Sequence, residues 1–371
     1  MKGKIALLDK PFGKFTIEEL EIPEPGKGEI LVKQVMCGVC GTDVHMYQGH
    51  LPGVRYPIVL GHEPIGTIEK LGEEVEADHS GRPVGEGDLI YVIPGLNCRK
   101  CYFCSVLREP TICLNGTGYG FNPFPDNPRS FSGGYADYIH MNHPWSTFVK
   151  MEARPEAAVL LEPLTVGIHA VDRARLRPGD TVAIQGCGAI GTSALIAAKE
   201  GGAFKVVVVG APESRLRFAR ELGADVTINI EEIRDPEERA RLVREESTGG
   251  YGVDAVFECT GVPAAVPEGI DMLRKGGTYA VVGHFTDAGS TSLNPFADFN
   301  NKHTTLVGVW GGDVAHFVRG RPIIESGKYP FERFVSHKLP LERCGDAMEA
   351  IMGNYRLDGK EADKLVIVGN P

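Results

Sequence analysis

The chain has 371 residues, a formal net charge of −10 and 42% hydrophobic residues. This length is typical of two domains, and the negative charge disfavours general binding to nucleic acid. The N-terminal stretch lacks the apolar core of a signal peptide, and no apolar run approaches the eighteen residues of a membrane span. We therefore expect a cytoplasmic, soluble protein that binds neither nucleic acid nor membrane.

The pattern of apolar runs changes along the chain. The first 150 residues or so are rich in Gly and Pro, and short runs such as "EILVKQV" and "DLIYVI" predict strands joined by turns. From about residue 165, almost wholly apolar runs alternate with segments of helical spacing; these runs are "DTVAIQG", "KVVVVGA", "VDAVFECTG" and "GGTYAVVG". Buried strands alternating with helices predict a parallel sheet of βαβ units. The charged segment 231–246 predicts a solvated helix.

A glycine-rich turn lies between the first of these predicted strands and the helix that follows. Residues 186–191 read Gly-Cys-Gly-Ala-Ile-Gly, the G-x-G-x-x-G pattern of dinucleotide-binding turns. Gly186 would permit the tight turn, Gly188 the approach of a pyrophosphate, and Gly191 close packing of helix on strand. Ala189 and Ile190 open the helix whose N–H groups would face the phosphates.

The end of the second predicted strand bears on the choice of cofactor. An acidic residue is expected there to accept hydrogen bonds from the adenosine ribose, but Gly210 occupies the position. Without that carboxylate nothing repels a 2′-phosphate, and Arg215 offers a cation, although Glu213 brings a negative charge close by. The sequence therefore predicts NAD or NADP, with a small preference for NADP and use of both.

Four cysteines are spaced C-x2-C-x2-C-x8-C: Cys98, Cys101, Cys104 and Cys113. Nine cysteines, an odd number, without a signal peptide argue against a disulfide framework. A bacterial ferredoxin run ends with a three-residue gap and Cys-Pro, whereas Leu114 follows the last cysteine here. The pattern favours tetrahedral zinc, and four protein ligands would make it a structural ion.

A second set of metal-binding residue types lies elsewhere in the chain. "CGVCGTDVH" contains Cys40, "GHE" contains His62 and Glu63, and "LLEPLTVG" contains Glu162. One thiolate, one imidazole and one or two carboxylates would hold zinc and leave a position open for water or substrate.

These segments, taken with "GCGAIG" and "ECTG" and in this order, resemble the zinc-dependent medium-chain dehydrogenases, the alcohol and sorbitol dehydrogenase family, over essentially the whole chain. The resemblance implies an α/β protein with two domains. A β-rich, GroES-like catalytic domain would comprise residues 1–164 and 306–371, with a structural zinc lobe at 95–118. A doubly wound Rossmann cofactor domain would comprise residues 165–305, with the active cleft between the two domains.

The resemblance also implies the metals and the reaction. One zinc ion would be catalytic, at Cys40, His62 and Glu162 with Glu63 beside it, and one would be structural. The family's last cysteine gap is usually seven residues and here it is eight, so the lobe is expected to bulge locally. The implied reaction is reversible hydride transfer between an alcohol, secondary, cyclic or polyol, and NAD(P).

Further roles follow from positions that match the family. Thr42 resembles its hydroxyl relay and His45 the imidazole that passes the proton to solvent, while Asp43 would orient the zinc-bound histidine. His284 follows a predicted strand and is expected near the cofactor. Apolar candidates for the substrate pocket are Phe121, Phe285 and Trp310. The family also implies a small-molecule alcohol or carbonyl substrate and a homodimer or homotetramer.

Two other classes of function remain open at this point. One is an iron–sulfur electron carrier, which the cysteine spacing and the nucleotide turn disfavour. The other is a non-catalytic zinc- and nucleotide-binding sensor, against which the complete ligand set argues.

Overall fold

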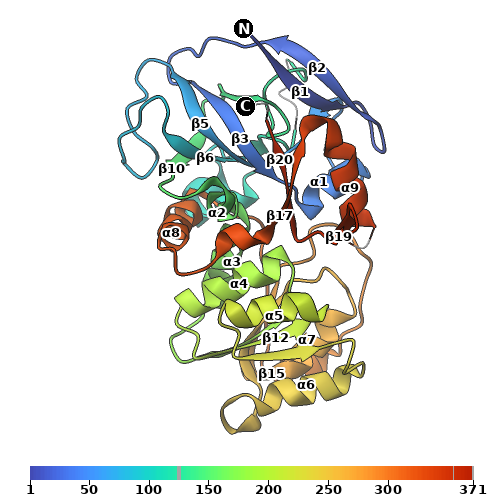
Figure 1. The fold of residues 1–371 in the computed structure, drawn as a ribbon. Coiled ribbons are helices and arrows are strands. Elements are labelled where there is room, and N and C mark those ends of the chain that lie inside the picture. The colour runs from blue at the N-terminus through green and yellow to red at the C-terminus, as the bar shows by residue number, and fades with distance from the viewer. Residues whose placement is uncertain (123–126, 354, 370–371) are drawn as a thin grey trace. The chain divides into compact units, whose positions relative to one another are not determined.

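The computed structural model describes residues 1–122, 127–353 and 355–369, and the chain forms two compact units. Unit 1 comprises Met1–Glu162 and Asp313–Pro371, and unit 2 comprises Pro163–Gly312 (Figure 1). The first division lies two residues before the expected boundary (162 against 164), and the second lies seven residues after it (312 against 305). In the described part of the chain, no helix is both long and apolar enough to cross a membrane.

Unit 1 is built on two sheets whose strands pair mainly antiparallel. The smaller sheet has the order β2 (Phe15–Glu21), β1 (Lys2–Leu8), β4 (Ile58–Val59). The larger has the order β10 (Thr147–Lys150), β6 (Leu89–Ile93), β5 (Glu63–Leu71), β3 (Ile30–Gly38), β20 (Lys364–Val368), β17 (Val335–Pro340), with β9 (Tyr138–Met141) also paired to β3. The helices of this unit are α1 (Gly41–Tyr47), α2 (Pro155–Ala158), α8 (Val314–Glu325) and α9 (Cys344–Met352).

The last strand of the chain completes the larger sheet. β20 pairs antiparallel with β3 near its end, with Val366 opposite Gly38 and Ile367 opposite Cys37. Two segments more than 300 residues apart in sequence thus meet beside β5. The candidate metal-binding residues lie at this point in unit 1.

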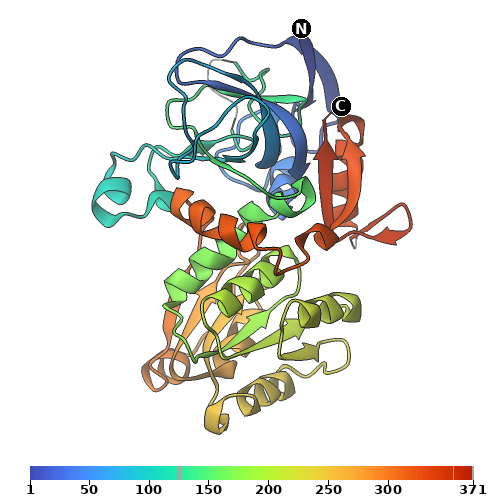
Figure 2. The same ribbon diagram turned by 60° about the vertical axis from the view of Figure 1, so that its left-hand side comes forward.

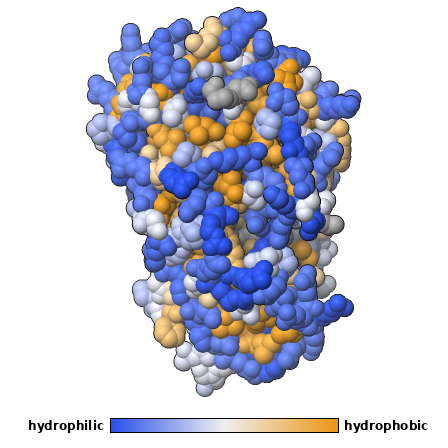
Figure 3. Space-filling model, viewed as in Figure 1, coloured by the Kyte–Doolittle hydropathy of each residue, from blue (hydrophilic) through white to orange (hydrophobic). Residues whose placement is uncertain are grey.

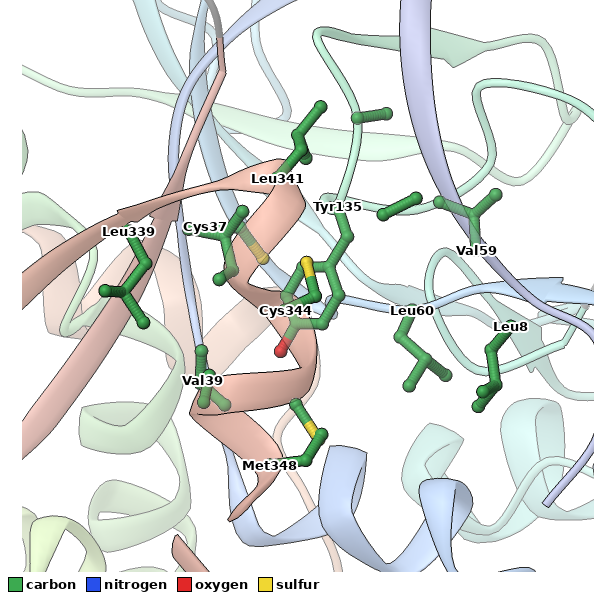
Figure 4. Close-up of a cluster of buried hydrophobic side chains, with 14 of the residues drawn as sticks. Leu8, Cys37, Val39, Val59, Leu60, Tyr135, Leu339, Leu341, Cys344 and Met348 are labelled. Carbon is green, nitrogen blue, oxygen red and sulfur yellow. The ribbon is translucent and has the colours of Figure 1, made fainter. Parts of the chain in front are cut away.

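The core of unit 1 packs α1 and α9 against the small sheet (Figure 4). Cys37 and Cys344 are completely buried there, among Leu60, Tyr135 and Met348. Both cysteines belong to this hydrophobic cluster and pack there as small hydrophobic side chains. Polar residues cover most of the face seen in Figure 3.

Unit 2 is a six-stranded parallel sheet in the order β13-β12-β11-β14-β15-β16. Its strands are β11 (Thr181–Gln185), β12 (Lys205–Gly210), β13 (Val226–Asn229), β14 (Val253–Glu258), β15 (Leu273–Val281) and β16 (Thr305–Gly308). Its helices are α4 (Ala189–Glu200), α5 (Glu213–Glu221), α6 (Pro236–Glu245) and α7 (Ala265–Met272), and α3 (Leu161–Ala174) leads into the unit. In Figures 1 and 2 the helices flank the sheet.

The strand order explains where a ligand would bind in unit 2. Chain order reverses between β11 and β14, because the strands after β11 add on one side and those from β14 onward on the other. In a doubly wound sheet, the crevice outside the carboxyl ends of the strands at this reversal binds the dinucleotide. The predicted Rossmann domain of βαβ units is confirmed, and the charged segment is helical over Pro236–Glu245.

Candidate metal centres and cofactor site

Asp43 organises the first candidate metal centre. Cys40 is the N-cap of α1, and its backbone N–H donates to Asp43 Oδ2 at 2.9 Å. The other oxygen, Oδ1, lies 3.1 Å from His62 Nδ1, and both side chains are almost fully buried. A proton on Nδ1 donated to Asp43 leaves Nε2 as the imidazole's free ligand atom. The Asp43 carboxylate therefore both caps α1 and orients the imidazole ring of His62.

Glu63 lies beside these residues in a buried ion pair. It is the first residue of β5, and its carboxylate contacts the ammonium group of Lys364, the first residue of β20. The two side chains are 1% and 3% exposed. Gly38 provides the space, because a Cβ there would overlap Glu63 Oε2 and lie 2.8 Å from Lys364 Cε. Burial opposes the charge of Lys364, but Glu63 and Cys40 outweigh it and raise its pKa.

The donors fit a metal ion. One ligand atom each from Cys40, His62 and Glu63 lies within 4.8 Å of the other two. Glu63 Oε1 is buried and accepts no hydrogen bond from the described residues. A thiolate, an imidazole and a carboxylate suit zinc, and three protein ligands leave a position for substrate.

Glu162, the second residue of α3, is outside this set of three ligand atoms. It is close enough to feel their charges, since burial and the Glu63 carboxylate raise the pKa of Glu162 to about 7. The structure therefore brings together Cys40, His62 and Glu63, with Glu162 as a neighbouring carboxyl group.

Thr42 and His45 both lie on α1, the helix that Cys40 begins. The Thr42 hydroxyl is 3.6 Å from Cys40 Sγ, next to the candidate ligands. The ring of His45 lies 6.1 Å from that of His50, and burial together with His50 lowers the pKa of His45. His45 is therefore mainly neutral near pH 7 and able to accept a proton. Phe121 stacks on His62 with ring centroids 4.5 Å apart.

The four cysteines of the predicted lobe converge. Their sulfur atoms, from Cys98, Cys101, Cys104 and Cys113, all lie within 4.8 Å of one another. Cys113 Sγ is 3.5 Å from Cys98 Sγ and 4.0 Å from Cys101 Sγ. A tetrahedron with Zn–S bonds of about 2.3 Å has sulfurs about 3.8 Å apart. The sulfurs therefore fit a single tetrahedrally coordinated ion, as zinc requires.

Hydrogen bonds prepare one of these thiols for a cation. The Asn115 amide and the backbone N–H groups of Lys100 and Cys101 lower the pKa of Cys98 to about 6. A metal ion would deprotonate the remaining cysteines on binding. The lobe begins and ends with the short antiparallel pair β7 (Gly95–Leu96) and β8 (Thr117–Gly118).

The glycine-rich turn of unit 2 has the geometry of a pyrophosphate site. Gly186 follows β11 with a φ of +99°, which only glycine adopts readily. A Cβ on Gly191 would overlap Gly186 O, so this glycine allows α4 to pack on the turn. Gly188, the N-cap of α4, has open space beside its Cα with respect to the described residues. Ala189 and Ile190 begin the helix. The turn therefore fits a phosphate at the helix N-terminus.

Gly210 ends β12, next to this turn. The candidate cation Arg215 is in the first turn of α5. The carboxylate of Glu213 forms an ion pair with Arg220, so its negative charge is partly offset.

Glu258 joins the loops that follow β14 and β15. Its Oε1 accepts hydrogen bonds from Thr260 N, Thr260 Oγ1 and Gly261 N at 2.6–2.7 Å, and its Oε2 accepts one from Gly283 N at 3.2 Å. His284 Nε2 is 3.7 Å from the same carboxylate. The predicted cofactor residue His284 is therefore held on a loop at the carboxyl end of the sheet. Nearby, Phe285 and Trp310 stack with ring centroids 4.4 Å apart.

Sequence reasoning missed two residues that bear on these sites. Lys364 begins an apolar strand, where a lysine is normally exposed, and nothing in the sequence marks it as the partner of Glu63. Cys187 is the variable residue inside the G-x-G turn, and its contact with Gly210 depends on tertiary structure.

Comparisons with known proteins agree with this geometry. Residues 26–153 match the family model of the alcohol dehydrogenase GroES-like domain, and residues 189–324 match that of the zinc-binding dehydrogenases. The chain is 32% identical over 345 residues to 5-exo-hydroxycamphor dehydrogenase of Pseudomonas putida, covering 90% of this chain and 92% of that one. It is 34% identical over 346 residues to sorbitol dehydrogenase of Ovis aries, covering 91% and 90%.

Solved structures show the same fold. An alcohol dehydrogenase from Thermotoga maritima superposes with a TM-score of 0.91 and 31% identity over 99% of both chains. The structure of a zinc-binding dehydrogenase from Sinorhizobium meliloti, solved bound to NADP, superposes with a TM-score of 0.83 and 26% identity over 99% of both chains. These matches disfavour an electron carrier or a non-catalytic sensor. The chain belongs to the zinc-dependent medium-chain alcohol dehydrogenase family and is an oxidoreductase that acts on a CH–OH group.

Proposed function

We propose that this enzyme oxidises secondary alcohols, carried on a ring or along a polyol chain, and reduces the corresponding ketones. The relatives named above act, by name, on a hydroxylated ring compound and on a polyol. The observation that carries the proposal is the convergence of Cys40, His62 and Glu63 beside the Thr42 hydroxyl. That arrangement provides three metal ligands, an open position and a group to take the substrate proton.

We assign Cys40 and His62 as constant ligands of a catalytic zinc ion, with the third ligand drawn from the carboxylates of Glu63 and Glu162. Zinc at this place would supply a Lewis acid, which lowers the pKa of a bound hydroxyl group toward neutrality. Asp43 holds the imidazole ring of His62 in position. The second zinc ion is assigned to the four cysteines of the lobe and has a structural role.

The released proton needs an acceptor, and we assign Thr42 and His45 to this task. The Thr42 hydroxyl can accept a proton from the substrate and donate its own onward. His45, whose pKa is lowered by burial and by His50, is available in the neutral form to receive a proton near pH 7. The Gly186–Gly191 turn would hold the pyrophosphate of the dinucleotide, and its nicotinamide would supply the hydride acceptor.

The cofactor is assigned as NADP or NAD, with NADP preferred. Gly210 presents no carboxylate to repel a 2′-phosphate, Arg215 lies in the first turn of the following helix α5, and Glu213 is paired with Arg220. A charge-assisted contact contributes about 1.5–3 kcal/mol, enough for a preference of tenfold or more.

Assembly and location form part of the proposal. β16 is an edge strand with exposed residues, including Leu306, and we infer that two copies pair along it to give a homodimer, or a homotetramer built from such dimers. The nine cysteines, all within the described residues, form no disulfide bonds, which suits the reducing cytoplasm.

The test is a panel of alcohols and ketones assayed with both cofactors. We expect kcat/KM for secondary alcohols to exceed that for matched primary alcohols by at least about tenfold. The matched control is Cys40→Ala, which should reduce no cofactor with any of them. A wild-type protein loaded with zinc that oxidises no secondary alcohol would refute the proposal.

A further inference from the structure

Cys187 and Gly210 are in direct contact at the cofactor turn. Cys187, between Gly186 and Gly188, is 4% exposed, and its thiol donates to Ala211 O at 3.2 Å. The position that a Cβ on Gly210 would take lies 2.7 Å from Cys187 Sγ, 3.2 Å from Cys187 N and 3.3 Å from Cys187 Cβ. A separation of 2.7 Å is well inside van der Waals contact, so the thiol fills the volume of the missing side chain.

The backbone at Gly210 does not itself require glycine. Gly210 is absent from the residues with positive φ, and it lies in regular parallel pairing with Asn229 of β13. Its carbonyl accepts from Ile230 N at 3.1 Å. Any amino acid could adopt this strand conformation, so the obstacle to a side chain here is the neighbouring residue.

The position is the one at which a Rossmann domain chooses between its cofactors. A carboxylate at the end of the second strand accepts from the ribose hydroxyls of NAD and repels the 2′-phosphate of NADP. β12 is the second strand of this sheet, and Gly210 is its last residue. A contact that keeps this residue small therefore also keeps the strand end uncharged.

We propose that Cys187 is a specificity-determining residue: its thiol occupies the space that an acidic side chain at position 210 would need, and so holds the strand end open to a 2′-phosphate. The inference rests on the proposed function, because it assumes that a nicotinamide dinucleotide binds at this turn. It makes cofactor choice a property of the pair of residues 187 and 210, and a carboxylate introduced at 210 alone is not accommodated.

The packing part of the proposal is tested by thermal unfolding of the full chain. Gly210→Ala adds only a Cβ, and we expect it to lower the unfolding midpoint by several degrees in the wild-type background. In a Cys187→Ala background the loss should shrink to less than half, because the sulfur is gone. Cys187→Ser is the matched control, since its hydroxyl still fills the space and the full loss should remain. Equal losses in all three backgrounds would overturn the proposal.

The cofactor part is tested by titrating each protein with NADH and NADPH and following the fluorescence of the reduced nicotinamide. We expect Cys187→Ala/Gly210→Asp to shift the ratio of the two dissociation constants toward NADH by at least about tenfold relative to wild type. Gly210→Asp alone should bind both cofactors more weakly. A single variant that is stable and already shows the full shift would overturn the role of Cys187. Wild type that binds neither cofactor would instead refute the proposed function, and the thermal comparison would still decide whether the two residues compete for space.

Discussion

Lys364 and Glu63 form an ion pair with both side chains buried, next to Cys40 and His62. The lysine comes from β20 and the glutamate from β5, and Gly38 on β3 leaves the room between them. A buried carboxylate that loses its cation is left with an uncompensated charge.

Lys364→Met should destabilise the metal-free protein by about 3–5 kcal/mol, because Glu63 stays buried without its counter-ion. The measurement is urea unfolding of the metal-free protein. The double variant Lys364→Met/Glu63→Gln removes both charges and should recover most of the loss. If the free energy of unfolding of the single variant fell by less than about 1 kcal/mol, the ion pair would stabilise the protein no more than a surface salt bridge does.

The two metal centres should differ in what their loss changes. Wild type is expected to contain two zinc ions per chain, and Cys40→Ala and Cys101→Ala one each. Cys40→Ala should lower kcat by at least about 10³-fold and should leave the unfolding midpoint nearly unchanged. Cys101→Ala should lower the free energy of unfolding by at least about 3 kcal/mol, because structural zinc contributes folding energy. Metal analysis, steady-state kinetics and denaturant unfolding check these outcomes, and equal effects of both substitutions would contradict the division of roles.

Zinc binding at the catalytic centre should depend on pH. Burial and the Glu63 carboxylate raise the pKa of Glu162 to about 7. Burial opposes a charge on His62, but Asp43 and Cys40 raise its pKa well above the usual value. Both groups therefore hold protons that the metal must displace, and zinc affinity should rise with pH. Below about pH 7 the Glu162 proton alone should contribute up to a tenfold rise per pH unit.

A chelator competition assay between about pH 5 and 7 measures how steeply zinc affinity rises with pH. Glu162→Gln should reduce this rise by up to one power of ten per pH unit. The Glu162 proton also determines how the free energy of unfolding of the metal-free protein changes with pH. The folded metal-free protein binds it more tightly than the unfolded chain, in which glutamate has a pKa of 4.5. The free energy of unfolding should therefore fall as pH rises from about 4.5 to 7. An unchanged slope in the variant would show that Glu162 does not titrate with metal binding.

The edge strand β16 should control assembly. Leu306 is 45% exposed on this strand, and Leu306→Glu would place charges opposite each other across a twofold axis. We expect dimer dissociation to increase at least about tenfold, or 1.4 kcal/mol. Light scattering over a range of protein concentrations measures it. Phe204→Glu, at a residue 69% exposed and outside β16, is the matched control and should leave the dimer intact. A wild-type monomer would contradict the assignment.

Much of the fold could be predicted because short stretches of sequence determine it. Runs such as "KVVVVGA" predicted buried strands, and Gly186 of the G-x-G-x-x-G pattern predicted the turn between strand and helix, where the structure has a φ of +99°. The convergence of Cys98 and Cys113 followed from their spacing. Each of these inferences depends on neighbours within about twenty residues of sequence.

The features that could not be predicted depend on contacts between distant segments. Nothing near Lys364 in the sequence indicates that it will be buried against Glu63. The reason for glycine at position 210 is likewise the sulfur of Cys187, on another loop. The position of Glu162 outside the three converging ligand atoms depends on where α3 begins relative to β5, which sequence patterns do not specify.

The discontinuous make-up of unit 1 also sets an order of events during translation. Unit 2 is one continuous segment and is complete once Gly312 has been made, whereas the larger sheet of unit 1 waits for β20. Glu63 is synthesised some 300 residues before Lys364, an interval of roughly 15–60 s at ordinary rates of elongation. Through that time Lys364 cannot balance the charge of the Glu63 carboxylate. The candidate metal centre around Glu63 therefore lacks one of its buried residues until almost the whole chain has been synthesised.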